Sequence, residues 1–504
     1  MRFLKDTKKF ITFEYNDVIP PHRSPLPPLK KQSKVKDSGK HIEYTVSATI
    51  FDNMVVQRNS YFNVFGWSEN ISGVIYGEFM GEQRYAVIDE EGSWCIQFSS
   101  HEATTETQIL KIYPKNGESV EFKNILVGDI WIVSGQSNSE LTVNNTISNN
   151  PKYKQEINPS DLIRIFPQYQ IDAIAAKETS DITKPQKDVV RAERKWQETT
   201  VDNVYAFSAL GYYFAKELTK NVSDVPIGVI MAAAGGAVLH ELMPDNIAKK
   251  VGLTQGNAVP SSGYYNTLIH PFTNNEITGM IFYQGESDCI NNRYETYATN
   301  LCETVNEYRK IWKTNFVFIN VQLSTHTPTS LTEWPQLPEI RVAQFNAYKM
   351  IKDSYIVTAM DQALKKHDPD WAHPGYKLEL GKRAATIAAS VVYNKLDSNY
   401  AFCPEPDTVK LEDTKVTIKF KYTGDGLKLL SGEVVSGFLL FDEEGQVNCT
   451  AKIINSNTIE VSTENVVMGS VVGFGYGLDH DGSVQKANVA NSLDYPLPAF
   501  KIIK

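Results

Sequence analysis

The alternation of apolar runs with helical stretches between about residues 126 and 395 constrains the fold of this chain more than any other feature. Runs such as residues 226–232 (PIGVIMA) and 316–323 (FVFINVQL) lack the polar alternation of a half-exposed strand. Such runs are typical of strands covered on both faces. Helical patterns such as residues 294–312 separate them, so we predict an α/β unit in which helices flank a parallel sheet.

Units of a different kind flank this α/β unit. Short alternating runs with Asn, Gly, Asp and Ser turns fill residues 43–125, a pattern typical of an antiparallel β-sandwich. Strand-like runs return near the C-terminus, and the first 40 residues carry 10 Lys or Arg against 4 Asp or Glu, with many prolines, which favours extended backbone. We therefore predict an extended arm (1–42), a β-sandwich (43–125), an α/β domain (126–397) and a C-terminal β domain (398–504).

Composition excludes several classes of partner. The net charge is -9 and no basic stripe follows the arm, so nucleic acid is not expected to bind. No stretch reaches the roughly 18 apolar residues of a membrane span, and the N-terminus lacks the apolar core of a signal peptide. We expect a cytoplasmic protein, or a periplasmic or secreted one if the N-terminus is truncated. Five scattered cysteines without a CxxC pair indicate neither a disulfide framework nor a zinc site.

The strand-like run at residues 129–133 (DIWIV) ends abruptly at Gly135-Gln136-Ser137-Asn138. This places Ser137 just beyond the carboxyl end of a strand, where open α/β sheets build their ligand sites. An ordinary strand-to-helix turn, capped by Ser137 or Asn138, would have the same sequence. The rest of the chain must decide between the two interpretations.

A serine nucleophile needs a base to accept its proton and an acid to orient that base. Residues 367–376 (HDPDWAHPGY) supply Asp370 and His373, three positions apart on one loop before the last long helix. A loop or helix cap is the simpler interpretation. A metal site is also conceivable there, but no recurring metal-ligand spacing is present, so we expect no metal.

Two more turns follow strands of the same unit. One strand ends at Gly235-Gly236, where the lack of side chains lets backbone N–H groups approach a ligand. Another ends at Gln284-Gly285-Glu286, which places an amide donor at the same edge of the sheet. Each alone could be plain turn chemistry, but four such turns on successive strands favour an active site.

Together these blocks resemble the sialate O-acetylesterase family, an SGNH-type group of carbohydrate esterases. The resemblance is carried, in chain order, by GDIWIVSGQSNSE, AFSALGYYFAKEL, PIGVIMAAAGG, YYNTLIHP, GMIFYQGESD and DWAHPG. It extends to FDNMVVQR and DEEGSW in the first β unit and to ANSLDYPLPAFKI near the C-terminus. It therefore covers nearly all of residues 45–504.

The resemblance implies a role for each block. Ser137 is expected to be the nucleophile, His373 the general base and then acid, and Asp370 the residue that orients it. The oxyanion is expected to accept hydrogen bonds from the Ser137 and Gly236 N–H groups and the Gln284 side chain. The implied substrate is an O-acetylated sugar, either sialic acid or an oligosaccharide, and no cofactor is needed.

Residues beside these groups are predicted to shape the substrate pocket: Gln136, Asn138, Glu286 and His240. The chain departs from the family at Ser139, Phe282 and Asp288, where methionine, tryptophan and asparagine are usual, and after the glycines, at Ala237, His240 and Leu242. These departures bear on the pocket more than on the chemistry. For His240, a packed or solvated helix residue is the simpler interpretation.

Two other functions remain open on the sequence. An acetylesterase acting on xylan or other plant oligosaccharides would use the same mechanism. A non-catalytic glycan-binding protein could use some of the 25 Tyr, 23 Phe and 7 Trp residues to stack on sugars. Retention of the serine, the DxxH pair and all three oxyanion elements argues against the binding protein, because a dead site has no physical need for them.

Overall fold

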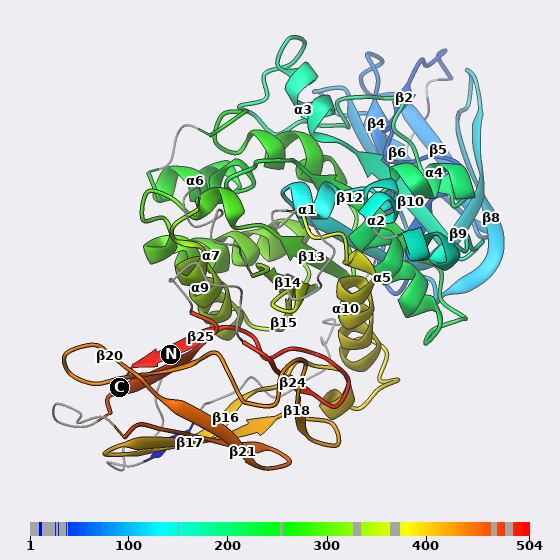
Figure 1. Ribbon diagram of the computed structural model, residues 1–504. Coiled ribbons are helices and arrows are strands. Elements are labelled where there is room, and N and C mark those ends of the chain that lie inside the picture. The colour runs from blue at the N-terminus through cyan, green and yellow to red at the C-terminus, as the bar shows by residue number, and fades with distance from the viewer. Residues whose placement is uncertain are drawn as a thin grey trace.

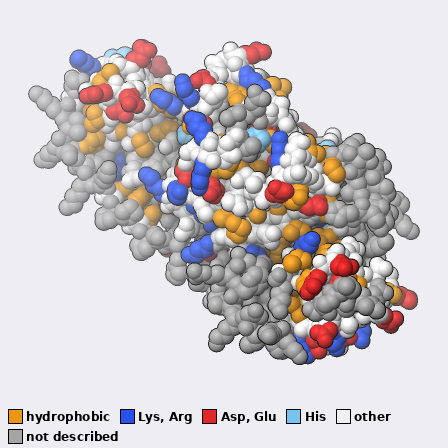
Figure 2. Space-filling model, turned by 90° about the vertical axis from the view of Figure 1, so that its left-hand side faces the viewer, with side chains coloured by type: hydrophobic (Ala, Val, Ile, Leu, Met, Phe, Trp, Pro, Cys, Tyr) orange, Lys and Arg blue, Asp and Glu red, His pale blue; other side chains and the backbone are white. Residues whose placement is uncertain are grey.

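The structure is a computed structural model that describes residues 10–12, 26, 29, 37, 39–149, 151–252, 256–325, 334–362, 373–464, 471–478 and 487–503. Figure 1 shows a central α/β unit between two groups of β-strands, with the N-terminal strands at one side and the C-terminal strands at the other. On the face shown in Figure 2, basic, acidic and hydrophobic side chains are interspersed.

The central sheet confirms the predicted α/β unit with parallel strands. Its order is β11-β10-β12-β9-β13-β14-β15, and all neighbours are parallel except the short β11. Nearly every residue in the five strands other than β9 and β11 is buried, as the apolar runs predict. The bounds are β9 (Val120–Gly135), β10 (Ile163–Gln168), β11 (Gln197–Glu198), β12 (Ile227–Ala233), β13 (Gly279–Tyr283), β14 (Val317–Gln322) and β15 (Ser354–Thr358).

The sheet has one pair of long helices on each of its two sides (Figure 1). One pair is α5 (Ala209–Thr219) with α10 (Lys377–Val391), and the other is α7 (Tyr294–Trp312) with α9 (Leu337–Met350). The helical pattern at residues 294–312 and the long helix expected after His373 correspond to α7 and α10. Shorter helices are α1 (Ser137–Glu140), α2 (Val143–Asn149), α3 (Gln170–Ala176), α4 (Val201–Ala206) and α6 (Asp245–Lys250). No helix in the described ranges is both long and apolar enough to cross a bilayer.

The N-terminal β unit is joined to the central sheet through β9. The first part of β9 pairs with β3 and β8, while its last residues, from Asp129 on, pair with β12 and β13. A boundary drawn at residues 125 and 126 therefore falls inside one continuous strand. The unit contains β2 (Thr45–Val46), β3 (Val55–Gln57), β4 (Phe62–Trp67), β5 (Val74–Phe79), β6 (Glu82–Val87), β7 (Ser93–Phe98) and β8 (Thr104–Pro114).

The C-terminal β unit takes one strand from the arm. Residues Phe10–Thr12 form β1, which pairs antiparallel with β16. The remaining strands are β16 (Glu405–Glu412), β17 (Lys415–Lys421), β18 (Leu427–Leu429), β19 (Phe438–Phe441), β20 (Gln446–Val447), β21 (Thr450–Asn455), β22 (Thr458–Ser462), β23 (Gly473–Tyr476), β24 (Val489–Asn491) and β25 (Phe500–Ile503). Phe345 of α9 and Ile356 of β15 belong to the same hydrophobic cluster as these strands, so the unit packs directly on the α/β domain.

A buried carboxylate lies where β9 passes from one unit to the next. Asp129 is 1% exposed and accepts hydrogen bonds from Gln57 (2.8 Å), Thr278 (2.7 Å) and Tyr393 (2.7 Å), and it pairs with the Arg58 guanidinium at 2.9 Å. Burial alone would raise the pKa of Asp129, but the charge of Arg58 and these hydrogen bonds hold it below its ordinary value. Asp129 therefore fastens the β-sandwich to the α/β domain as an ionised group.

Replacing Arg58 by methionine tests how far the ion pair of Asp129 stabilises the folded protein. We expect Arg58→Met to lower the free energy of unfolding at pH 7 by about 3 kcal/mol, because an unpaired buried carboxylate remains. Without Arg58, burial should raise the pKa of Asp129, so the variant takes up a proton as the pH falls and the loss should shrink from pH 7 toward 3.5. Urea unfolding across this range measures both effects.

The matched control is Lys249→Met, which breaks the exposed ion pair with Asp245 and should change stability little. A loss for Arg58→Met no larger than that of the control would contradict the prediction.

Candidate active site

The turn after β9 presents Ser137 at the carboxyl edge of the sheet. Gly135 has φ +128°, and a Cβ there would lie 2.1 Å from the Tyr283 carbonyl oxygen, so only glycine fits. The Gln136 N–H donates to the same carbonyl at 2.9 Å, and α1 begins at Ser137. Later strands lie on both sides of β9, which makes this edge the switch point at which open α/β sheets bind ligands.

The structure brings Ser137 and His373 together. Ser137 Oγ lies 2.8 Å from His373 Nε2, although 236 positions separate the two residues in sequence. Both side chains are half-buried, and Pro374 after the histidine is buried. Asp370 lies outside the described residues, so its contact with His373 stays a prediction.

An open cavity of about 500 Å³ lies over this pair. Its lining is mostly polar, as suits a ligand rich in hydroxyl groups. The lining residues are Ser137, Glu140, Leu141, Thr142, Asn145, Ser148, Tyr169 and His373. The sequence analysis missed Glu140 and Tyr169, although the position of Glu140, three residues after the serine on the same turn, was a usable signal.

The Gly235-Gly236 turn lies beside the serine, as predicted. A Cβ placed on Gly235 would lie 3.8 Å from Ser137 Cβ, and Gly236 has φ +70° with open space where its Cβ would be. Within the described part of the chain, no group accepts a hydrogen bond from the N–H of Ser137 or of Gly236. Both amides are therefore available to an acceptor bound beside Ser137.

Gln284 is fully buried and its amide is already engaged. Its Nε2 donates to Asp288 at 2.6 Å and to the Ala237 carbonyl at 3.1 Å, while its Oε1 accepts from Tyr297 at 2.8 Å. Because the NH₂ group has two hydrogens, donation to an oxyanion would require one of these bonds to break. Its role as an oxyanion donor stays a prediction, for which turnover by Gln284→Ala is the direct test.

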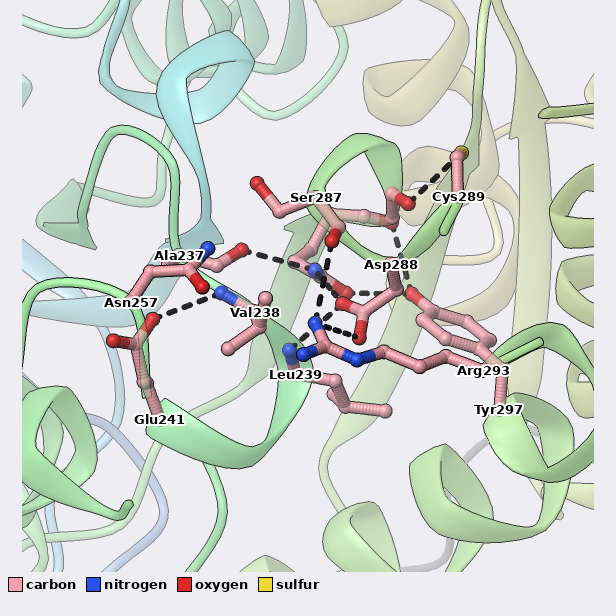
Figure 3. Close-up of polar contacts among 12 residues, drawn as sticks. Ala237, Val238, Leu239, Glu241, Asn257, Ser287, Asp288, Cys289, Arg293 and Tyr297 are labelled. Atoms are coloured by element: carbon pink, nitrogen blue, oxygen red, sulfur yellow. Dashed lines mark hydrogen bonds and ion pairs between the residues drawn. The ribbon is translucent and has the colours of Figure 1, made fainter. Parts of the chain in front are cut away.

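Asp288, one of the departures from the family, ties two loops of the site together (Figure 3). Besides Gln284, its carboxylate accepts the Leu239 N–H at 2.9 Å and pairs with Arg293 at 3.5 Å. Burial raises the pKa of Asp288, against the opposing effects of the Gln284 and Leu239 hydrogen bonds and the Arg293 charge. An acid is tolerated here because Arg293 lies close to it.

A second buried network links the loop of Ser137 to the loop of His373. Lys377, at the start of α10, donates to Asn138 Oδ1 at 2.8 Å and to the Pro374 carbonyl at 2.5 Å, and Asn138 donates to Glu286 at 2.5 Å. One ammonium group thus contacts the residue that follows Ser137 and the residue that follows His373. Burial raises the pKa of Glu286 to about 7, although hydrogen bonding by Asn138 and the charge of Lys377 act in the opposite direction.

The residues predicted to shape the substrate pocket do not line the cavity. Gln136, Asn138, Glu286 and His240 are 2%, 1%, 4% and 1% exposed, and none is among its lining residues. Their burial suits a role in holding the turns, and contact with a sugar stays a prediction for all four. Among the described side chains, no group of three His, Cys, Asp or Glu residues could hold a metal ion.

Comparisons with known proteins identify the family of the chain. The sequence model of a family described as "Carbohydrate esterase, sialic acid-specific acetylesterase" matches residues 127–390, which is more than half of the chain. Proteins named sialate O-acetylesterase from Pongo abelii and Homo sapiens are each 25% identical over 293 residues, covering 52% of this chain and 54% of theirs. The chain thus spans about half the length of the curated relatives it matches.

A solved structure extends the likeness to nearly the whole chain. A protein from Xanthomonas citri described as a carbohydrate acetylesterase superposes with a TM-score of 0.76 at 24% identity. The superposition covers 91% of this chain and 99% of that one. The flanking β units therefore belong to the shared fold.

The buried carboxyl group of Glu286 should leave a signature in the pH dependence of stability. Because its pKa is raised from 4.5 to about 7, folding favours the protonated form, and stability is lost as the pH rises through this window. Glu286→Gln should remove that loss, so the variant should gain up to roughly 3 kcal/mol relative to wild type between pH 5 and pH 8. Denaturant unfolding at both pH values measures the gain.

Glu178→Gln, at an exposed position, is the control and should follow wild type at both pH values. A difference between Glu286→Gln and wild type that does not change with pH would mean that Glu286 is already ionised at pH 5.

Proposed function

Since the chain belongs to the carbohydrate esterase family of sialic acid-specific acetylesterases, we propose that it is a serine esterase that hydrolyses acetyl esters on sugar hydroxyls. The observation that carries the proposal is the 2.8 Å approach of Ser137 Oγ to His373 Nε2 beneath an open polar cavity. The parallel sheet and the positions of GQSN and YQGES at its carboxyl edge support an SGNH-type fold for the α/β domain.

The proposed reaction has two steps that share one site. His373 accepts the Ser137 proton while the serine oxygen attacks the acetyl carbonyl, and the sugar alcohol leaves with that proton. Water, activated by the same histidine, then attacks the acetyl-serine ester and releases acetate. The free N–H groups of Ser137 and Gly236 support an oxyanion hole for both tetrahedral intermediates.

Asp370 is proposed to orient His373, on the strength of the DxxH spacing in the sequence. In serine proteases the corresponding acid contributes about 10,000-fold. Asp370→Asn, assayed beside the wild-type protein, tests this role, and an unchanged rate would exclude it.

Removal of the nucleophile gives the primary test. We expect the purified protein to release nitrophenol from p-nitrophenyl acetate, and Ser137→Ala to reduce kcat/KM by at least about 1000-fold, because the variant lacks the hydroxyl group that is proposed to form the acyl-enzyme. Ser99→Ala, in the β-sandwich, should behave like the wild-type protein.

Equal rates for wild type and Ser137→Ala would exclude Ser137 as the nucleophile. If acetylated oligosaccharides bind but neither protein releases acetate, the glycan-binding interpretation replaces the esterase.

The charge of the cavity predicts a preference among sugars. The described lining contains the carboxylate of Glu140 and neither lysine nor arginine. Burial raises the pKa of Glu140, so the assay is run on the alkaline side, near pH 8, to favour the ionised form. A second carboxylate held a few ångströms away in water is repelled by about 1 kcal/mol.

We therefore expect an uncharged O-acetylated sugar to be a better substrate than an acidic one of the same shape. The two substrates to compare are O-acetylated sialic acid and the analogue in which its carboxylate is replaced by an uncharged carboxamide. The carboxamide should have a kcat/KM about 3- to 10-fold higher at low salt, and the ratio should shrink in 0.5 M salt because screening weakens the repulsion. A preference for the acid at low salt would contradict the prediction.

A further inference from the structure

Two side chains hold Gly235, one by its N–H group and the other by its carbonyl group. The Gly235 N–H donates to Glu140 Oε2 at 2.9 Å, and the Gly235 carbonyl accepts from Gln170 Nε2 at 2.5 Å. The two side chains are also joined to each other, because the Gln170 N–H donates to Glu140 Oε1 at 3.0 Å. Gln170 itself is anchored by a 3.0 Å hydrogen bond to the hydroxyl of the fully buried Tyr264.

The planarity of the peptide makes this contact informative. The Gly235 carbonyl and the Gly236 N–H belong to one peptide group, in which the trans arrangement points them in opposite directions. Fixing the carbonyl on Gln170 therefore fixes the direction of the Gly236 N–H. A pair of glycines has no side chains to resist rotation of the peptide, so this restraint must come from other residues.

Glu140 connects the same glycine to Ser137. It lies on α1 three residues after Ser137, so its hydrogen bond to Gly235 couples the position of the turn to that of the serine. Gly235 is close enough that its added Cβ would be 3.8 Å from Ser137 Cβ. The proposed oxyanion amide and the nucleophile are thereby parts of one hydrogen-bonded unit.

The next two carbonyls of the turn are held in the same way. Asn257 Nδ2 donates to the Gly236 carbonyl at 3.1 Å, and Gln284 Nε2 donates to the Ala237 carbonyl at 3.1 Å. Figure 3 shows Ala237 on this turn and Asn257, which belongs to a later segment of the chain. Three consecutive carbonyls each accept from a carboxamide side chain, so rotation of any one peptide would break a hydrogen bond.

We propose that Glu140 and Gln170 are positioning residues of the esterase, which hold the Gly236 N–H toward the oxyanion that forms at Ser137. This inference rests on the proposed function. Neither residue touches the reacting atoms in this scheme. Their effect is confined to the transition state, because the orientation of the amide matters most when the negative charge develops.

The test uses Glu140→Gln, Gln170→Leu and the double variant in the p-nitrophenyl acetate assay. We expect Gln170→Leu to lower kcat about 10- to 100-fold, with KM within about threefold of wild type, because a misplaced donor weakens only the transition state. Glu140→Gln should have a smaller effect, since its amide oxygen can still accept one N–H. The double variant should lose less than the product of the two single losses, because both residues restrain Gly235 and are hydrogen-bonded to each other.

A control separates this role from general loss of structure. Gln186→Leu removes a carboxamide that donates to the Asp181 and Lys184 carbonyls, away from Ser137, and should leave kcat unchanged. A trifluoromethyl ketone, which forms an oxyanion on Ser137, should bind at least about tenfold more weakly to Gln170→Leu than to wild type, and the thermal midpoints give the readout of folding.

Each outcome decides one question. If Ser137-dependent turnover is present but Gln170→Leu keeps kcat and ketone affinity within threefold of wild type, the positioning role is wrong while the esterase stands. If wild type and Ser137→Ala turn over equally, the proposed function fails, and the positioning role fails with it. Strictly multiplicative losses in the double variant would show that Glu140 and Gln170 act independently. This result would overturn the proposal that the two residues jointly hold the Gly236 N–H in place.

Discussion

The structure depends on a single continuous strand, β9, which belongs to two units at once. Its first part is paired with strands of the N-terminal β unit, and its last residues lie at the centre of the parallel sheet and end at the turn before Ser137. One uninterrupted strand therefore joins the N-terminal β unit to Ser137. The buried ion pair of Asp129 with Arg58 lies at the point of transition, and it makes the junction rigid because an unpaired carboxylate there would be costly.

Most polar side chains near Ser137 and His373 are already hydrogen-bonded within the protein. Behind the cavity, nearly every buried polar side chain described above is engaged with the backbone or with another side chain, rather than exposed to a substrate. Lys377 contacts the residues after Ser137 and after His373, and Asp288 joins the loop of Leu239 to that of Gln284. Such preorganisation is what an oxyanion site requires, since dipoles already in place need not reorganise during the reaction.

The departures from the family pattern have physical explanations in part. Asp288 replaces an amide by a carboxyl group, and Arg293 supplies the opposite charge. Ser139 is buried and donates to the Ser134 carbonyl at 2.8 Å, so its hydroxyl is satisfied within the turn. Nothing in the structure explains the change at Phe282 beyond its ring contact with Phe318 on the neighbouring strand.

The sequence by itself determined the α/β architecture, because strand burial and the turns that end strands follow local patterns, whereas the pairing of Ser137 with His373 was expected only from the family resemblance. It did not separate pocket residues from buried ones: Gln136 and Asn138 adjoin Ser137 in sequence, yet both are buried. Only the tertiary structure decided that Glu140 and Tyr169 line the cavity and that Gln170 holds Gly235. Hydrogen bonds between segments far apart in the chain have no local signature, since they depend on where the sheet brings its loops together.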